Sequence, residues 1–203
     1  LLFQGRLAGE RFYDVSSTGE KVPFRRIRLS PTPQAFGGQP QPSVYLTDVT
    51  GPFGENANNE TPVKRQRPLP GSPTQLAAAR AGIVTPEMAY VATRENLCRQ
   101  QLKTEVEAQG NEKLIKLLSP ALDAPLFTPE QIRDLVATRQ AVIPCNFNHP
   151  ECEPMVIGKH FATKVNANIG TSSSSKNWRE ELDKLKESLL CGADTVMDLS
   201  TGK

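Results

Sequence analysis

The sequence has little of what membrane-spanning, nucleic-acid-binding and disulfide-stabilised proteins depend on. No stretch of it approaches the ~18 apolar residues of a membrane span. The formal net charge is only +2, and the short basic clusters at 25–28 and 64–67 lack interleaved aromatic residues. We therefore expect neither nucleic acid nor a membrane as partner. Four cysteines without an export signal predict a reducing compartment, and the protein is expected to be cytoplasmic.

Histidine is also scarce, which limits the metal sites that this chain can build. Cys145, His149 and Cys152 are the one candidate group, but six residues separate the two cysteines, whereas zinc sites favour closer pairs. A Cys-x2-Cys cluster motif is absent. A cysteine nucleophile with a histidine base would lack an orienting third group. We predict no metal site and no catalytic residue within this chain.

Residues 1–75 are predicted to hold strands and Pro/Gly-rich loops. The first residues, Leu-Leu-Phe-Gln-Gly, resemble the remnant of a viral protease cleavage site, so residues 1–9 do not enter the fold prediction. Alternating apolar and polar residues predict strands at 11–15 and 22–29. Proline cannot donate to a strand ladder, so Pro23 is expected at a sheet edge or a strand start. The proline-rich stretch that follows contains one extended segment, 44–49.

Residues 76–140 are predicted to be the helical part of an N-terminal domain. Thr85-Pro86-Glu87 places an N-cap, a first-turn proline and an acid in the order typical of a helix start, and this helix is expected to run toward Gln109. Residues 128–131, Thr-Pro-Glu-Gln, repeat the pattern with a capping box.

Residues 141–203 are predicted to begin a (β/α)8 barrel. Strand-like residues 163–170 precede an amphipathic helix with apolar residues at 178, 182, 185 and 189, which Gly192 should end, and a strand at 195–199 follows. This is the unit from which parallel sheets are built, and such sheets are normally covered on both faces. The predicted fold class is therefore α/β: an N-terminal α+β domain followed by the first βα units of a truncated (β/α)8 barrel. A doubly wound sheet is the alternative.

The candidate ligand-binding residues lie at the ends of these two strands, because barrel active sites occupy the carboxyl ends of the strands. Asn168 can present both a donor and an acceptor to a polar ligand. Met197 and Asp198 end the second strand. Gly170 precedes hydroxyl residues and a helix start, so its backbone could approach a phosphate, or it could simply form the turn.

Five ordered blocks of residues carry a resemblance to a known family. They are 81–96 with Thr-Pro-Glu-Met and Arg-Glu-Asn, 143–151 (Ile-Pro-Cys-Asn-Phe-Asn-His-Pro-Glu), 153–158 (Glu-Pro-Met-Val-Ile-Gly), 164–170 (Lys-Val-Asn-Ala-Asn-Ile-Gly) and 192–202 (Gly-Ala-Asp-Thr-Val-Met-Asp-Leu-Ser-Thr-Gly). These blocks resemble the signature segments of the ThiC family of phosphomethylpyrimidine synthases. The resemblance covers residues 22–203 and is weakest at 31–75 and 98–125.

The resemblance implies a radical S-adenosylmethionine carbon–carbon lyase of thiamine biosynthesis. Such an enzyme converts 5-aminoimidazole ribonucleotide to 4-amino-5-hydroxymethyl-2-methylpyrimidine phosphate. It implies S-adenosylmethionine, a [4Fe-4S] cluster and a zinc-type metal in a parent enzyme that is a homodimer as the full-length protein. Two of the family's substrate contacts match Asn168, as a hydrogen-bonding partner of the ribonucleotide, and Met197, as part of the pocket wall.

Departures from the family pattern bear on function. Cys145 replaces the usual alanine, and Thr171 replaces a common asparagine beside the candidate site. The family's metal-binding histidines and cluster cysteines have no counterparts in this chain, so the 203 residues alone are expected to be inactive. The alternative is a non-catalytic binding or assembly module derived from the same N-terminal region. A different phosphate-binding barrel lyase is disfavoured by the five ordered blocks.

Overall fold

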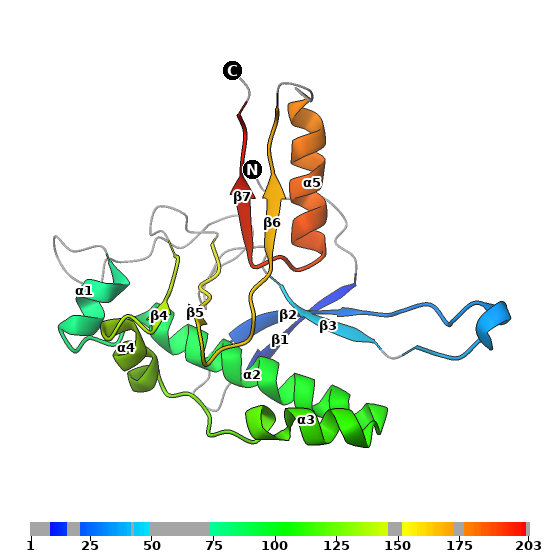
Figure 1. The fold of residues 1–203 in the computed structure, drawn as a ribbon, viewed down its shortest axis with the longest axis horizontal. Coiled ribbons are helices and arrows are strands. Elements are labelled where there is room, and N and C mark those ends of the chain that lie inside the picture. Colours follow the sequence, from blue (N-terminus) through cyan, green and yellow to red (C-terminus); the bar gives the residue numbers. More distant parts are fainter. Residues whose placement is uncertain are drawn as a thin grey trace. The chain divides into compact units, whose positions relative to one another are not determined.

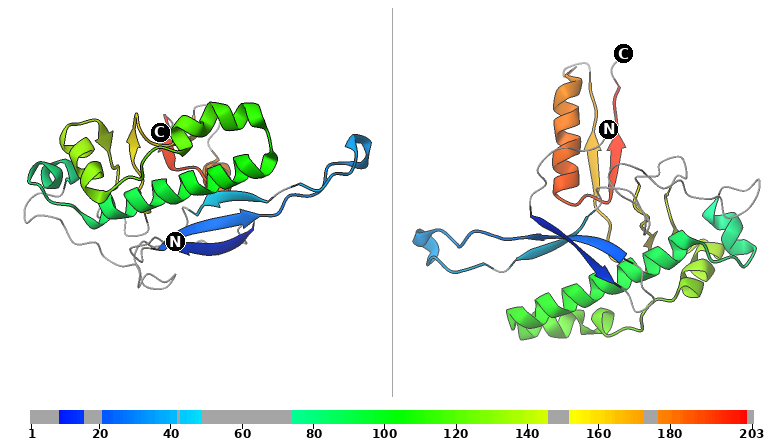
Figure 2. Two further views of the ribbon diagram at one scale, coloured as in Figure 1. Left: turned by 90° about the horizontal axis from the view of Figure 1, so that it is seen from below. Right: turned by 180° about the vertical axis from the view of Figure 1, so that it is seen from behind.

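The computed structural model describes residues 9–15, 21–41, 43–48, 74–145, 152–172 and 177–201. The chain divides into two compact units, each described here by itself. The first comprises Leu1–Tyr13, Pro23–Gly51 and Thr163–Lys203, and the second comprises Asp14–Val22 and Pro52–Ala162. The described residues form a mixed α/β structure of helices and small sheets, without a closed barrel (Figures 1 and 2).

A three-stranded sheet is formed by β1 (Glu10–Val15), β2 (Lys21–Ile27) and β3 (Val44–Thr47). The predicted strands at 11–15 and 22–29 and the extended segment at 44–49 are thus confirmed within a few residues. β2 and β3 are antiparallel and are joined through a long hairpin that carries a short 3-10 helix, η1 (Gln34–Phe36) (Figure 1). Aromatic rings stabilise this sheet, because Phe12 stacks on Phe24 with centroids 5.9 Å apart and meets Tyr45 edge-on at 5.9 Å.

Pro23 lies near the start of β2, which agrees with one of the two alternatives, but β2 is the middle strand, so the alternative of a sheet edge was wrong. The order of the strands is β1-β2-β3. The carbonyl of Pro23 accepts from Asp48 N at 2.9 Å, just beyond the last paired residue of β3, Thr47. A residue's carbonyl and N–H point to the same side in an antiparallel ladder, so the missing N–H falls where β3 has already ended.

An ion pair is buried beside this sheet. Asp48 has a fully buried side chain, and its two carboxylate oxygens lie 3.0 Å from Arg25 Nη2 and 3.1 Å from Arg11 Nε. Arg25 is itself only 3% exposed. Buried charges are tolerated when they are paired in this way, and the loss of one member of such a pair is strongly destabilising.

Within the described residues, the second unit contains four helices and one short antiparallel pair of strands. The elements are α1 (Gln75–Arg80), α2 (Pro86–Gln109), α3 (Glu112–Leu122), α4 (Pro129–Ala137), β4 (Ala141–Val142) and β5 (Ile157–Gly158). The predicted helix from Thr85 to Gln109 and the capping box at Thr128 are confirmed: Thr85 Oγ1 accepts from Met88 N at 3.2 Å, and Thr128 Oγ1 accepts from Gln131 N at 3.2 Å. α1 and α3 were not predicted.

The core of this unit lies where α2, α4 and the β4–β5 strand pair meet. Its fully buried members include Met88, Ile132 and Val156. Burial of an aliphatic side chain of this size contributes about 1.5–3 kcal/mol, so this cluster supplies much of the unit's stability. None of the described helices is both long and apolar enough to cross a bilayer.

Residues 94–96 of α2, Arg-Glu-Asn, have a structural role in this unit. Arg94 Nη1 donates to the carbonyl of Pro154 at 3.3 Å, and Glu95 Oε2 accepts from Ala162 N at 3.0 Å. The Asn96 amide both donates to and accepts from the backbone of Phe127 at 2.9 Å. Three consecutive side chains of α2 therefore each hold a backbone group that lies far from α2 in the sequence, at Pro154, Ala162 and Phe127.

The predicted strand–helix–strand unit is confirmed in the C-terminal part of the chain. It consists of β6 (Asn166–Ile169), α5 (Trp178–Leu190) and β7 (Thr195–Asp198). β6 and β7 are parallel, and α5 packs against β6 (Figure 1). Gly192, with φ of 77°, follows the helix end as predicted.

Candidate functional site

The two predicted ligand-binding residues are neighbours on adjacent parallel strands. In the register of β6 and β7, Asn168 lies opposite Met197, and Asn166 lies opposite Thr195. Side chains alternate between the two faces of a strand, so these four residues share one face of the pair. Asn166, Asn168 and Met197 are exposed on it, Met197 at 50%. A polar and an apolar side chain are thus presented together near the carboxyl ends of both strands.

The exposed face carries a row of side-chain hydrogen bonds. Thr195 Oγ1 donates to Asn166 Oδ1 at 2.7 Å, and Asn166 Nδ2 donates to Asn168 Oδ1 at 2.8 Å. The row crosses from β7 to β6 and then follows β6 toward its carboxyl end. The Asn168 amide is therefore held in place by the hydrogen bond that its oxygen Oδ1 accepts from Asn166.

The segments that follow the two strands continue side by side. Leu199 N donates to the carbonyl of Ile169 at 2.8 Å, and Thr201 N donates to the carbonyl of Thr171 at 3.0 Å. Gly170, with φ of 148°, makes this close approach possible. A Cβ at this position would lie 2.7 Å from backbone atoms of Leu199 and Ser200, a separation that no side chain permits.

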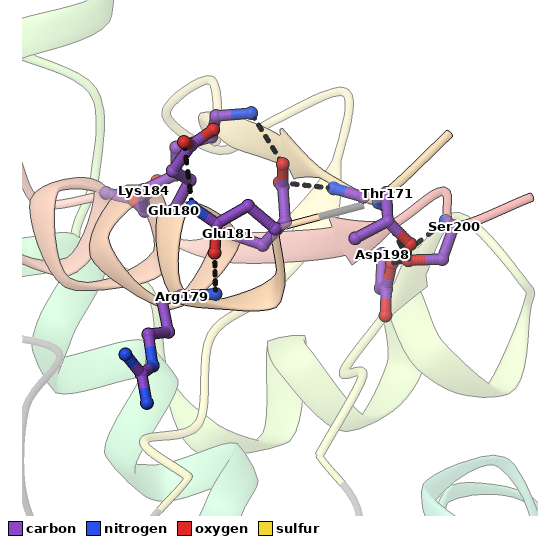
Figure 3. A network of polar contacts seen from close by, with 10 residues as sticks. Thr171, Arg179, Glu180, Glu181, Lys184, Asp198 and Ser200 are labelled. Atoms are coloured by element: carbon purple, nitrogen blue, oxygen red, sulfur yellow. Dashed lines mark hydrogen bonds and ion pairs between the residues drawn. The ribbon is translucent and has the colours of Figure 1, made fainter. Parts of the chain in front are cut away.

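The side chain of Glu181 in α5 fixes the backbone where β6 ends. Its Oε2 accepts from Gly170 N at 2.7 Å, and its Oε1 lies 2.8 Å from Lys184 Nζ. Figure 3 shows the carboxylate between Lys184 and the loop that carries Thr171. The hydrogen bond from Gly170 N–H, together with Lys184, lowers the pKa of Glu181 below its ordinary value. Glu181 is buried, at 7% exposure, and it is expected to be ionised at neutral pH.

This arrangement bears on the two interpretations of Gly170. Its N–H is already taken by a carboxylate, and an anionic phosphate at the same place would meet the charge of Glu181. The α5 N-terminus is capped by Asn177, whose Oδ1 accepts from Arg179 N at 3.2 Å. The turn-forming role is the one that the structure supports. Residues 173–176 of the hydroxyl-rich loop lie outside the described residues.

The segment after β7 is ordered by Asp198. Its Oδ1 accepts from both the backbone N–H and the hydroxyl of Ser200, at 2.9 and 2.6 Å. These two hydrogen bonds lower the pKa of Asp198, the hydroxyl contributing most. Ser200 Oγ in turn accepts from Thr171 N at 3.1 Å (Figure 3). Asp198 therefore holds Ser200 in place, and Ser200 links the segment after β7 to the segment after β6. The lowered pKa keeps the Asp198 carboxylate ionised at neutral pH.

Sequence reasoning missed Glu181, although a signal was present. Trp178 and Leu182 were expected to form the apolar face of the helix, but they are 63% and 36% exposed. Glu181 follows Trp178 by three residues and precedes Leu185 by four, so it belongs to the same side of the helix. An acid inside an apolar stripe indicates a specific buried partner, which here is Gly170 N–H.

The cysteine–histidine group offers no metal site among the described residues. Cys145 and Cys152 are half-buried, and His149 lies outside the described part of the chain. Within the described ranges, no three His, Cys, Asp or Glu side chains lie together as metal ligands. Structural zinc and iron–sulfur clusters need such a set, which the described residues do not supply.

The candidate site is thus a strand–helix–strand unit with two parallel strands and polar side chains at its strand ends, the edge of a sheet at which parallel α/β enzymes bind their ligands. A comparison with family models agrees with this class. The model of the radical SAM ThiC family matches residues 74–203, well over half of the chain. The chain belongs to the radical SAM ThiC family. This family acts in the biosynthesis of the thiamine pyrimidine, and its class implies S-adenosylmethionine and an iron–sulfur cluster in the parent enzyme.

Proposed function

We propose that this chain is the N-terminal portion of a phosphomethylpyrimidine synthase. The parent enzyme would convert 5-aminoimidazole ribonucleotide to 4-amino-5-hydroxymethyl-2-methylpyrimidine phosphate by radical carbon–carbon lyase chemistry. The observation that carries the proposal is the placement of Asn168 opposite Met197 near the ends of two parallel strands, in a chain of this family. Binding at such strand ends is the rule for parallel α/β enzymes.

Asn168 and Met197 would have different roles toward the ribonucleotide. The Asn168 amide is exposed, and it supplies a hydrogen bond that orients a polar ligand. Met197 offers a flexible apolar surface directly beside it, suited to one face of a flat heterocycle. A polar contact that fixes orientation within a largely apolar wall is the usual composition of a small-molecule site.

The surface of the strand–helix–strand unit supports its placement in a larger barrel. Val165, Met197 and Leu199 are 59%, 50% and 52% exposed around β6 and β7, and Trp178 and Leu182 are exposed on α5. Two parallel strands rarely form a stable sheet by themselves, and such sheets are covered on both faces. Further strands and helices of a (β/α)8 barrel would cover these side chains.

We expect the metal groups of the parent enzyme to be held outside the described residues. S-adenosylmethionine with a [4Fe-4S] cluster supplies radical chemistry when bound, and a zinc-type metal would accompany them. The described residues provide no set of ligands for the cluster or the zinc. Residues 1–203 alone are therefore expected to be inactive. The parent is expected to be a cytoplasmic homodimer.

Product formation by the intact protein, as its gene encodes it, tests the proposal. The protein is reconstituted anaerobically with iron and sulfide and supplied with S-adenosylmethionine, a reductant and 5-aminoimidazole ribonucleotide. We expect mass spectrometry to detect the pyrimidine phosphate for the intact protein and not for residues 1–203. Asn168→Ala should raise KM, whereas Leu117→Ala, on the exposed surface of α3, should not. Intact protein that forms no product would contradict the proposal.

One observation favours the alternative of a non-catalytic module: the second unit has a buried core of its own, centred on Met88, Ile132 and Val156. Such a core is what an independent binding or assembly module requires. A cooperative thermal transition of residues 1–203, together with an inactive intact protein, would support this alternative. Activity of the intact protein would exclude it as the principal function.

A further inference from the structure

We propose that Thr195 and Asn166 set the orientation of the Asn168 amide, so that Asn168 acts toward the ligand as a hydrogen-bond donor. This inference rests on the proposed function, because it takes Asn168 to be a ligand contact. It adds the direction of that contact and two positioning residues that do not touch the ligand. It also restricts the kind of ligand atom that can lie at Asn168.

The direction follows from the row of hydrogen bonds across the strands. The Thr195 hydroxyl has one hydrogen, which it gives to Asn166 Oδ1 at 2.7 Å. The Asn166 amide is thereby turned with its nitrogen toward Asn168, and Nδ2 donates to Asn168 Oδ1 at 2.8 Å. The Asn168 oxygen is engaged by this bond, and within the described ranges no residue accepts a hydrogen bond from Asn168 Nδ2.

The backbone makes this row possible. Asn166 and Asn168 are two residues apart in β6 and therefore share a face, and Thr195 lies opposite Asn166 in β7. The N-terminal end of β7 is anchored to the residue before β6, because Asp194 N and Thr195 N both donate to the carbonyl of Val165, at 2.9 and 3.2 Å. The Asp194 carboxylate accepts from Val165 N at 2.9 Å. Thr195 is thus fixed next to Asn166 before any ligand binds.

The orientation determines which ligand atoms are recognised. An amide nitrogen offers only hydrogens, so the ligand atom that meets Asn168 Nδ2 must be an acceptor, such as a ribose, phosphate or carboxamide oxygen or an unprotonated ring nitrogen. An exocyclic amino group that can only donate would leave two donors facing each other, which costs the desolvation of both. For 5-aminoimidazole ribonucleotide, Asn168 would therefore contact an oxygen or the bare ring nitrogen, and not the 5-amino group.

Two acidic substitutions test the direction in the intact protein, with isothermal titration of 5-aminoimidazole ribonucleotide as the assay. Asn166→Asp can only accept, so it should attract Asn168 Nδ2 and turn the Asn168 oxygen toward the ligand. Asn168→Asp replaces the donor with a carboxylate. Each should weaken binding at least as much as Asn168→Ala, for which we expect about a tenfold rise in Kd from one lost hydrogen bond.

Thr195 supplies the matched pair for a positioning role. Thr195→Val keeps the shape of the side chain but removes the hydroxyl that orients Asn166, and Kd should rise about threefold to tenfold. Thr195→Ser retains the hydroxyl and should restore the wild-type Kd. If Thr195 acted only in strand packing, the loss of its methyl group in Thr195→Ser would also weaken binding. If Thr195 acts by orienting Asn166, Thr195→Ser should bind the ligand as the wild type does.

The outcomes separate this inference from the proposed function. Weakened binding by Asn166→Asp, Asn168→Asp and Thr195→Val, with wild-type binding by Thr195→Ser, supports the proposal that Thr195 and Asn166 orient the Asn168 amide. Wild-type affinity in both acidic variants, while Asn168→Ala binds weakly, overturns the direction of the hydrogen bond and leaves Asn168 in the site. Wild-type affinity in Asn168→Ala overturns the inference together with the assignment of Asn168 to the site.

Discussion

Replacement of Gly170 by alanine should disrupt the strand ends that form the candidate site. Gly170 directly follows β6, and a Cβ there would lie 2.7 Å from the Leu199 carbonyl carbon and from Ser200 N. Both are backbone atoms that cannot turn aside as a flexible side chain could. The residue also has a φ of 148°, which L-amino acids with a side chain rarely adopt.

The size of the effect can be worked out from these contacts. Unfavourable backbone geometry of this kind costs about 1–3 kcal/mol. Separation of the two segments also breaks the hydrogen bonds from Leu199 N to Ile169 and from Thr201 N to Thr171, which contribute about 1 kcal/mol each. We therefore expect Gly170→Ala to lower the free energy of unfolding by about 3–5 kcal/mol.

Gly192→Ala is the matched control within the same unit. Gly192 also has a positive φ, of 77°, but a Cβ there would meet only the Leu46 side chain at an ordinary 3.5 Å. Its substitution should cost about 1 kcal/mol from backbone strain alone. Urea unfolding followed by the fluorescence of Trp178, the one tryptophan of the chain, reports on this unit. Equal destabilisation by the two substitutions would refute the argument that backbone contact at Gly170 is decisive.

Three further substitutions test other parts of the structure. Asp48→Asn leaves Arg25 buried without its counter-charge and should destabilise the first unit by about 3 kcal/mol in urea unfolding. Because its pKa is lowered on folding, Glu181 stabilises the protein at neutral pH, and this contribution disappears as the pH falls through its folded pKa; Glu181→Gln should therefore flatten the acid limb of a stability–pH curve. Thr128→Ala removes the α4 N-cap and should cost about 1 kcal/mol by thermal unfolding, while Thr128→Ser retains most of that stability.

Local signals in the sequence predicted those elements whose ends are chemically marked. α2 begins at Pro86, directly after the N-cap Thr85, and ends before a glycine, and α4 carries a complete capping box, so both were found. α3 begins with an equally good cap, since Asn111 Oδ1 accepts from Leu114 N at 3.2 Å, but Pro120 within its last turn obscured it. β4 could not be assigned a partner, because its pairing with β5 depends on a contact across many intervening residues.

The candidate site was predictable only as far as the strand ends themselves. The rule for parallel sheets pointed to the strand ends, the resemblance to the ThiC family narrowed them to Asn168 and Met197, and the structure places these two residues in register. The roles of Thr195 and Glu181 depend on distances between different elements. The spacing of residues along the sequence does not reveal these distances. Pro23 illustrates the same limit, because its ladder position depends on where β3 ends.

Hydrogen–deuterium exchange with bound ribonucleotide tests the central claim most directly. The intact protein is compared with and without saturating 5-aminoimidazole ribonucleotide, and peptides across the described chain are followed by mass spectrometry. We predict slower exchange in the peptides that contain 166–172 and 195–201, and loss of that protection in Asn168→Ala. Binding that protects other peptides and leaves these two unchanged would contradict it.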